Sequence, residues 1–143
     1  MLQDQDIAQS VSEIWGAMLG LDIQTISKTQ DRSHDQMTGL ISIAGVWPCQ
    51  VRLICSRTLA CALTSIMFDT ETHDLVDEDV EDAFRELTNM IGGSVKAMMP
   101  EPCTLSLPTI DATPGPSAPN PRHALTFACQ GDAFKVEVHP TVV

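Results

Sequence analysis

Two polar residues in the stretch FRELTNMIGG, residues 84–93, are of kinds that could assist a reaction. Glu86 and Asn89 are three residues apart, so on a helix their side chains are neighbours on one face. A carboxamide does not titrate near neutral pH, which excludes Asn89 as a general base. It can instead hold a water molecule through a donor and an acceptor, and orienting an attacking water is a recognised role in phosphoryl transfer. Glu86 could pair with a lysine of a bound partner. The same spacing is also common in pairs of solvated residues on exposed helices, so the spacing alone does not decide between these interpretations.

The residues around this pair predict a long amphipathic helix from about 77 to 98, which Pro100 and Pro102 stop. At roughly 100° per residue, the apolar positions share one line and the polar positions share the opposite line. The apolar line consists of Val80, Phe84, Leu87, Ile91, Val95 and Met98. The polar line consists of Asp82, Glu86, Asn89, Gly93 and Lys96. Glu86 and Asn89 are therefore expected to point outward, with Asp82 one turn earlier.

Gly92 and Gly93 are unfavourable in a helix, each costing about 1 kcal/mol relative to Ala. One interpretation is that Gly92 is a C-cap and that the helix ends there. The other is that the helix continues, because Val95 and Met98 keep its phase. In that case Gly93 lies on the outward line with Asn89, and its missing side chain lets another molecule approach. Gly93 would then belong to a docking face.

The other elements predict an α+β fold with a largely antiparallel sheet, two long helices and a short one. Apolar spacing predicts a first helix over 4–19, capped by Gly20. Residues 12–20 and 85–93 can be aligned, which raises the alternatives of a pseudo-two-fold repeat or of two similar amphipathic helices. In that alignment Gly16 stands where Asn89 stands. The remaining predicted elements are strands 37–45 and 49–55, a short helix 58–68, a strand 103–110, and a hairpin of 123–130 with 133–139. Between the last two, residues 111–121 are rich in proline and predict an irregular loop, with its Pro-rich part at 114–121.

Composition limits the classes of function. The 143 residues fit one domain, 1–143, and 43% of them are hydrophobic, enough for a core. The formal net charge is −11 with only eight scattered Lys and Arg, which argues against nucleic acid and anionic membrane as partners. No apolar run is long enough for a membrane span, and a signal peptide is not expected. Five cysteines without metal-site spacing favour a reduced, cytoplasmic protein.

Acidic residues are concentrated between Asp69 and Glu86. They could form a solvated face, or a surface for a partner that carries lysines or a cation. A metal-dependent hydrolase built on this run and His73 is an alternative, although the run lacks the glycine and terminal glutamate of an EF-hand loop. A purely structural protein is a further alternative.

The stretch DAFRELTNMIGGSVK, followed by LSLPTI, resembles the CheX branch of the CheC/CheX/FliY chemotaxis phosphatases. The family pattern begins with an Asp or Ser, which three intervening residues separate from a Glu. Two further intervening residues separate the Glu from an Asn, and a Pro follows later in the chain. Here these are Asp82, Glu86, Asn89 and Pro108. The predicted order of elements also matches the family over nearly the whole chain, while the specific part of the resemblance covers residues 79–110.

The resemblance implies a phosphatase that acts on the aspartyl phosphate of a CheY-like response-regulator receiver domain. Asn89 would align the attacking water and Glu86 would pair with the receiver's lysine. Asp82 and Gly93 would belong to the partner-binding surface. The Mg²⁺ belongs to the receiver, so no metal or cofactor of this chain's own is implied. A homodimer through sheet edges is also implied.

The sequence departs from the two-motif members of the family, because Gly16 replaces the carboxamide in the first helix. This departure favours the single-motif, CheX-like form and predicts that the first helix is inactive. A non-catalytic module that binds receiver domains with the same fold is the main alternative.

Overall fold

The computed structural model describes residues 2–27, 35–111 and 121–141. The expected Pro-rich loop at 114–121 therefore lies outside the described residues, except for its last position.

The described chain forms three α-helices, one short 3₁₀ helix and seven strands. The helices are α1 (Asp4–Leu19), α2 (Arg57–Phe68), η1 (Thr72–Asp74) and α3 (Asp77–Ala97). The strands are β1 (Gln24–Ile26), β2 (Gln36–Gly45), β3 (Cys49–Ser56), β4 (Cys103–Leu105), β5 (Thr109–Asp111), β6 (His123–Cys129) and β7 (Asp132–Pro140). The predicted α+β class is confirmed.

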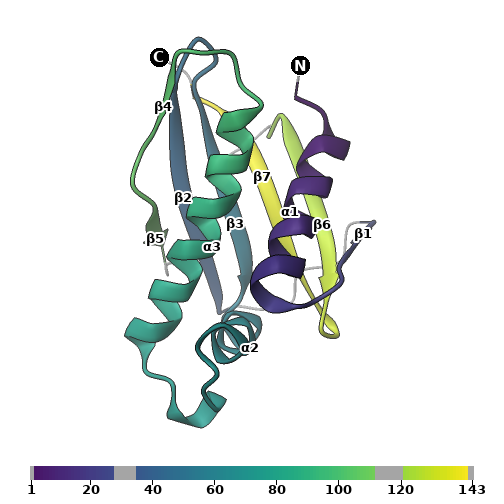
Figure 1. Ribbon diagram of the computed structural model, residues 1–143, viewed down its shortest axis with the longest axis vertical. Helices are drawn as coiled ribbons and strands as arrows, with labels where there is room; N and C mark the ends of the chain where they lie inside the picture. Colours follow the sequence, from purple (N-terminus) through teal and green to yellow (C-terminus); the bar gives the residue numbers. More distant parts are fainter. Residues whose placement is uncertain (1, 28–34, 112–120, 142–143) are drawn as a thin grey trace.

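All described strands join one antiparallel sheet in the order β1-β6-β7-β3-β2-β4, with β5 also paired to β2. Helices α1 and α3 lie side by side across one face of the sheet, and α2 lies at one end (Figure 1). The sheet order is symmetric about the β7–β3 pairing. Each hairpin, β2–β3 or β6–β7, receives at its outer side a short strand from the other half of the chain. This arrangement has the pseudo-two-fold character that the aligned helices predict.

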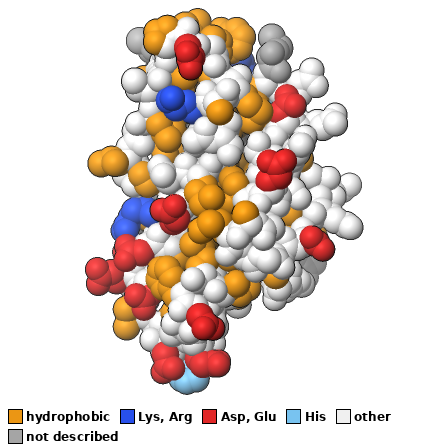
Figure 2. Space-filling model, viewed as in Figure 1, with side chains coloured by type: hydrophobic (Ala, Val, Ile, Leu, Met, Phe, Trp, Pro, Cys, Tyr) orange, Lys and Arg blue, Asp and Glu red, His pale blue; other side chains and the backbone are white. Residues whose placement is uncertain are grey.

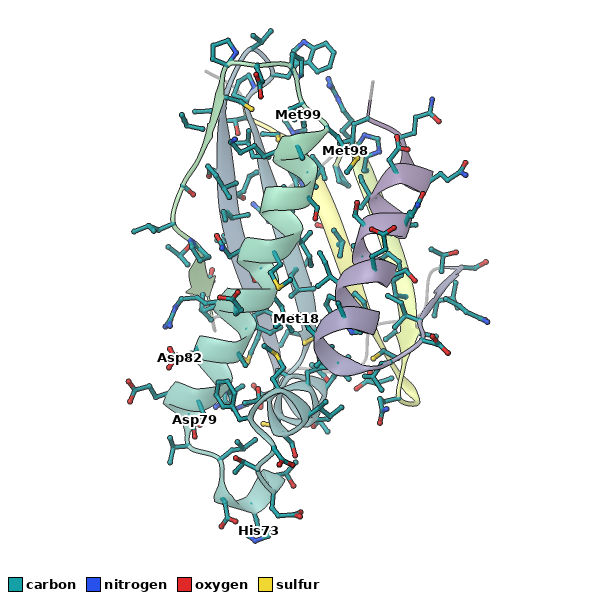
Figure 3. The ribbon with its side chains drawn as sticks, viewed as in Figure 1. Met18, His73, Asp79, Asp82, Met98 and Met99 are labelled. Carbon is teal, nitrogen blue, oxygen red and sulfur yellow. The ribbon has the colours of Figure 1, made fainter. Side chains whose placement is uncertain are left out.

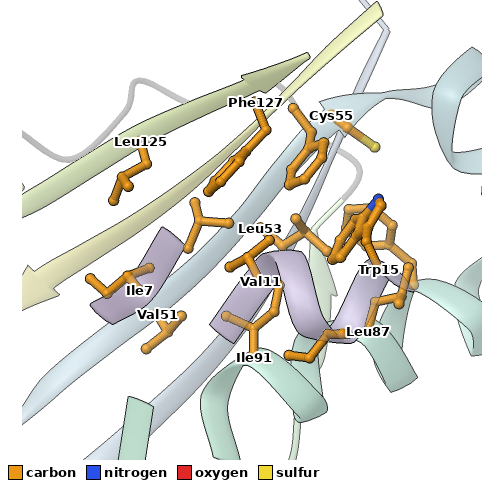
Figure 4. Close-up of a cluster of buried hydrophobic side chains, with 14 of the residues drawn as sticks. Ile7, Val11, Trp15, Val51, Leu53, Cys55, Leu87, Ile91, Leu125 and Phe127 are labelled. Atoms are coloured by element: carbon orange, nitrogen blue, oxygen red, sulfur yellow. The ribbon is translucent and has the colours of Figure 1, made fainter. Parts of the chain in front are cut away.

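The core lies between the helices and the strand residues that alternate toward them, such as Val51, Leu53 and Cys55 of β3 (Figure 4). Trp15 of α1 is fully buried and stacks on Phe134 at a centroid distance of 4.4 Å. Met18 also fits the apolar spacing of α1, but it is 36% exposed. The buried residues of α1 are Ile7, Val11, Ile14, Trp15 and Leu19.

The structure differs from the sequence-based prediction at two places, both of which involve short strands. Residues Gln24–Ile26 pair with β6, although no strand was predicted there. The single strand predicted over 103–110 is divided into β4 and β5, which both pair with β2 on either side of Pro108. Pro108 has no backbone N–H to donate to a ladder, which is consistent with the interruption.

The hairpin β6–β7 turns through Gln130 and Gly131, which both have positive φ angles, 54° and 76°. This conformation matches the tight hairpin turns that suit the twist of antiparallel strands. Within the described ranges, no helix has both the length and the hydropathy to cross a membrane. All five cysteines are free thiols.

Candidate functional site

Helix α3 begins with a cap and a charge distribution that favour a helix at this point. The carboxylate of Asp79 accepts a hydrogen bond from the backbone N–H of Val76 at 3.3 Å. Asp77, Glu78 and Asp79 lie in the first turn, where negative charge interacts favourably with the helix dipole. Asp77 also forms an ion pair with Arg57 at the start of α2. Part of the acidic run therefore has a structural role.

The inward face of α3 lies unusually close to strand β2. A Cβ atom on Gly39 of β2 would lie 2.0 Å from Oγ1 of Thr88, and a Cβ atom on Gly92 would lie 2.6 Å from Cγ2 of Ile41. Thr88 is 1% exposed, and its hydroxyl donates to the carbonyl of Phe84 at 2.8 Å. The two glycines, one in each element, permit this close approach of α3 to β2.

The two glycines of α3 have different roles. The helix continues past both to Ala97, so the interpretation of Gly92 as a C-cap is wrong. Gly92 is buried, and a side chain there would meet Ile41 of β2, so this position favours glycine. A Cβ atom on Gly93 would meet no atom within 4 Å, so this glycine leaves open space one turn beyond Asn89.

The outward face of α3 presents Glu86 and Asn89, and both residues are exposed. Their neighbours Leu87 and Thr88 are each only 1% exposed. No hydrogen bond or ion pair joins either side chain to another described residue. At a spacing of three residues, their Cβ atoms are about 5–6 Å apart. A water molecule and a cation could therefore be held by adjacent groups.

Asp82 is on the outer side of α3, one turn before Glu86 (Figure 3). Its carboxylate accepts a hydrogen bond from Nη1 of Arg85 at 2.7 Å, and Nη2 of Arg85 lies 3.7 Å from Oε2 of Glu81. Sequence reasoning did not assign a role to Arg85. The spacing of three and four residues to these carboxylates was the available signal. Asp82 therefore keeps a partner on its own helix, whereas Glu86 has none among the described residues.

Acidic side chains gather along the start of α3 and around η1 (Figure 2). His73 lies at the far end of this region, 3.6 Å from a carboxylate oxygen of Asp74, and is 76% exposed (Figure 3). Over the described ranges, no group of three or more His, Cys, Asp or Glu side chains is arranged to hold a metal ion. The alternative of a metal-dependent hydrolase therefore has no ligand set in this part of the chain.

Buried thiols do not provide a nucleophile at this site. Burial raises the pKa of Cys55, and the nearby Asp132 carboxylate raises it further. Burial also raises the pKa values of Cys49 and Cys129. Protonated thiols are poor nucleophiles, so these cysteines are structural.

Comparison with protein families and solved structures identifies the fold. The family described as chemotaxis phosphatase CheX matches residues 37–130. A chemotaxis protein CheX from Vibrio vulnificus has a TM-score of 0.76 at 18% identity, over 96% of this chain and 95% of that chain. A CheX from Desulfovibrio desulfuricans has a TM-score of 0.73 at 18% identity, over 96% and 97% of the two chains.

A CheX–CheY–BeF₃–Mg²⁺ complex from Borrelia burgdorferi has a TM-score of 0.75 at 15% identity, covering 96% of this chain and 97% of that chain. Comparison with curated proteins finds no significant match. The family match covers most of the chain and includes the whole of α3. The chain therefore belongs to the CheX family of chemotaxis phosphatases.

Proposed function

We propose that this protein hydrolyses the aspartyl phosphate of a response-regulator receiver domain, with Asn89 and Glu86 as the residues that act on it. The observation that supports this proposal most directly is the outward exposure of both side chains on a helix whose opposite face is buried. The Borrelia burgdorferi complex provides a precedent for a CheX protein bound to CheY with BeF₃ and Mg²⁺.

In this proposal Asn89 enters the receiver's site and positions the attacking water. Its carboxamide can accept one hydrogen bond from the water and donate another to a phosphoryl oxygen. The gain in rate would come from holding the water in line with the phosphorus atom, which removes the entropic cost of positioning it. The charges that stabilise the transition state, including Mg²⁺, would come with the receiver domain. No titrating group of this chain is needed.

Glu86 would pair with the receiver's lysine and so align the two proteins. A charge-assisted hydrogen bond of this kind is stronger than a neutral one. Asp82 would add negative potential at the edge of the docking surface, although its carboxylate is already in an ion pair with Arg85. Gly93 would let the partner's backbone approach α3 closely, because no atom lies within 4 Å of the position of its missing Cβ. The acidic run would favour encounter with a lysine-bearing surface.

The experiment is a screen of phosphorylated receiver domains from the same genome in the cytoplasmic conditions that we expect for this protein. Each receiver is labelled at its aspartate, and the half-life of the acyl phosphate is measured with and without the protein. We expect at least one receiver to lose its phosphate faster in proportion to the protein concentration. Binding of a phosphorylated receiver with no change in half-life would instead identify a non-catalytic receiver-binding module.

We also propose that the protein is a homodimer joined at a sheet edge. The described sheet ends in short strands, β1 on one side and β4 with β5 on the other. Unpaired edge groups can pair with a second chain. Light scattering during size exclusion would give the mass of two chains, and the mass of one chain at micromolar concentration would contradict this proposal.

A further inference from the structure

A cavity of about 460 Å³ opens at the end of the molecule where the β2–β3 hairpin turns. Its walls come from Leu2 before α1, the hairpin turn and the start of β3, the segment after α3, and the chain at the start of β6 and the end of β7. The volume is within the range of pockets that enclose small molecules. This end of the molecule is about 12 Å along α3 from Asn89, so the cavity is separate from the outward face described above.

The wall of this cavity is largely apolar, and part of it is open to solvent. Trp47 is 42% exposed and Val46 is 60% exposed. Met99 follows the end of α3 beside the hairpin, and hydrophobic side chains gather at this end of the surface (Figures 2 and 3). An exposed indole beside a concave apolar wall is typical of a binding site rather than of a surface in contact only with water.

Arg122, just before β6, and His123, its first residue, line the same cavity, and their surroundings differ. Nδ1 of His123 lies 2.6 Å from a carboxylate oxygen of Asp4, so His123 already has an acidic partner. The backbone N–H of Arg122 donates to the carbonyl of Val138 at 2.8 Å, which fixes the base of the side chain at the rim. No hydrogen bond or ion pair joins its guanidinium to another described residue.

The charge of Arg122 acts on the inner wall of the cavity. Burial raises the pKa of the Cys49 thiol, and the nearby Arg122 guanidinium opposes that rise. Cys49 lines the cavity and is 5% exposed. A guanidinium beside an apolar wall attracts an anion, especially in a chain whose formal net charge is −11. The thiol remains protonated, so the chemistry of the cavity is binding and not nucleophilic attack.

We infer that this cavity binds a small amphipathic carboxylate, with the carboxylate on Arg122 and the apolar chain or ring against Trp47 and Met99. A planar guanidinium matches the two oxygens of a carboxylate. The aromatic and thioether side chains provide the apolar contact. This site is independent of the phosphatase proposal, since none of its residues lies on the outward face of α3.

The test uses octanoate and 1-octanol as probes on the full chain. Binding is followed by the indole N–H signal of Trp47 in NMR spectra, which Trp47→Phe assigns. We expect octanoate to bind saturably with a Kd of about 1 mM or tighter. Octanol, which has the same apolar chain without the charge, should bind about tenfold more weakly.

Arg122→Gln should weaken octanoate binding about tenfold and leave octanol binding unchanged. Lys135→Gln is the matched control, because it removes the same charge from a residue of β7 that does not line the cavity. Equal weakening by the two variants would show only a bulk charge effect and would overturn the inference. Absence of a saturable shift, or equal affinities for octanoate and octanol, would also overturn it. Circular dichroism spectra of the variants establish that each is folded.

Discussion

Asn89 and Glu86 point outward because the residues between and beside them point inward. Leu87 and Thr88 are each 1% exposed, and Thr88 contacts the position that a side chain on Gly39 would occupy. The direction of the two polar groups is therefore set by packing on β2 and not by contacts of their own. This arrangement separates their chemistry from the stability of the fold, since an exposed polar residue can be replaced at little cost.

The role proposed for Glu86 predicts a difference between two neighbouring carboxylates. Glu86→Gln removes a charge that has no partner among the described residues, whereas Asp82→Asn removes one that Arg85 already pairs. We expect Glu86→Gln to raise the KM for the phosphorylated receiver about tenfold. Asp82→Asn should raise KM less than about threefold, because its charge is shared and solvated. Steady-state phosphate release measures both, and equal effects would contradict a specific role for Glu86.

At the scale of elements, the position of α3 depends on a close approach between helix and sheet. Gly39 and Gly92 stand at the two points of contact, each beside a side chain of the other element. The sequence shows both glycines in places where glycine is unfavourable, inside a strand and inside a helix. Such glycines indicate a close approach of backbones, but the partner of each follows only from the three-dimensional structure.

Gly92 and Gly93 form a matched pair for a stability experiment. Gly92→Ala would place a methyl group 2.6 Å from Cγ2 of Ile41, so we expect a loss of about 1–3 kcal/mol in the free energy of unfolding. Gly93→Ala meets open space on the same helix and should gain up to about 1 kcal/mol. Urea denaturation of both variants measures these changes. A destabilised Gly93→Ala variant would show that this position is not open.

Most elements were predictable because their patterns are long and regular. The alternation in β2 and β3 and the apolar line of α3 predict both their type and their bounds to within one or two residues. The three-residue strand β1 was not predictable from its own residues QTI. The repeat gives an indirect indication of β1, because β4 follows α3 as β1 follows α1. Apolar spacing in α1 does not by itself distinguish Trp15, which is buried, from Met18, which is 36% exposed.

The candidate site was only partly predictable. Periodicity predicts that Glu86 and Asn89 share an outward face, and the structure has both exposed. The pairing of Asp82 with Arg85 depends on which of several nearby acids the guanidinium meets. The separate cavity near Trp47 could not be predicted, because its lining residues come from distant parts of the sequence.

At the scale of the whole molecule, the symmetric sheet carries two long helices of which only α3 has the motif. Gly16 of α1 has open space around the position of its missing Cβ, as Gly93 does. The first helix therefore has no side chain in the position that corresponds to Asn89. We expect one receiver to be bound per chain, at α3.

The buried thiols predict that stability falls at alkaline pH. Burial raises the folded-state pKa values of Cys49, Cys55 and Cys129 above the ordinary value of 9.0. The unfolded chain loses these protons at lower pH than the folded chain, so their contribution is complete below about pH 9 and is lost as pH rises beyond it. Each fully shifted thiol contributes up to about 1.4 kcal/mol per pH unit.

Urea denaturation at pH 8, 9 and 10 measures this dependence. Cys55→Ala should reduce the loss between pH 9 and 10, because Cys55 is the most deeply buried of the three thiols and burial raises its pKa. Cys61→Ala, at a half-buried position of α2, is the control. An unchanged slope in Cys55→Ala would show that this thiol does not contribute.

The most direct test of the central claim is the single-turnover rate of receiver dephosphorylation with wild-type protein and with Asn89→Ala, both at saturating concentration. If Asn89 positions the attacking water, Asn89→Ala should lower this rate at least about 100-fold. The affinity of the Asn89→Ala variant for the receiver bound to BeF₃ and Mg²⁺ should change little. The free energy of unfolding of this variant should stay within about 0.5 kcal/mol of wild type. A dephosphorylation rate that is unchanged in Asn89→Ala would contradict the account.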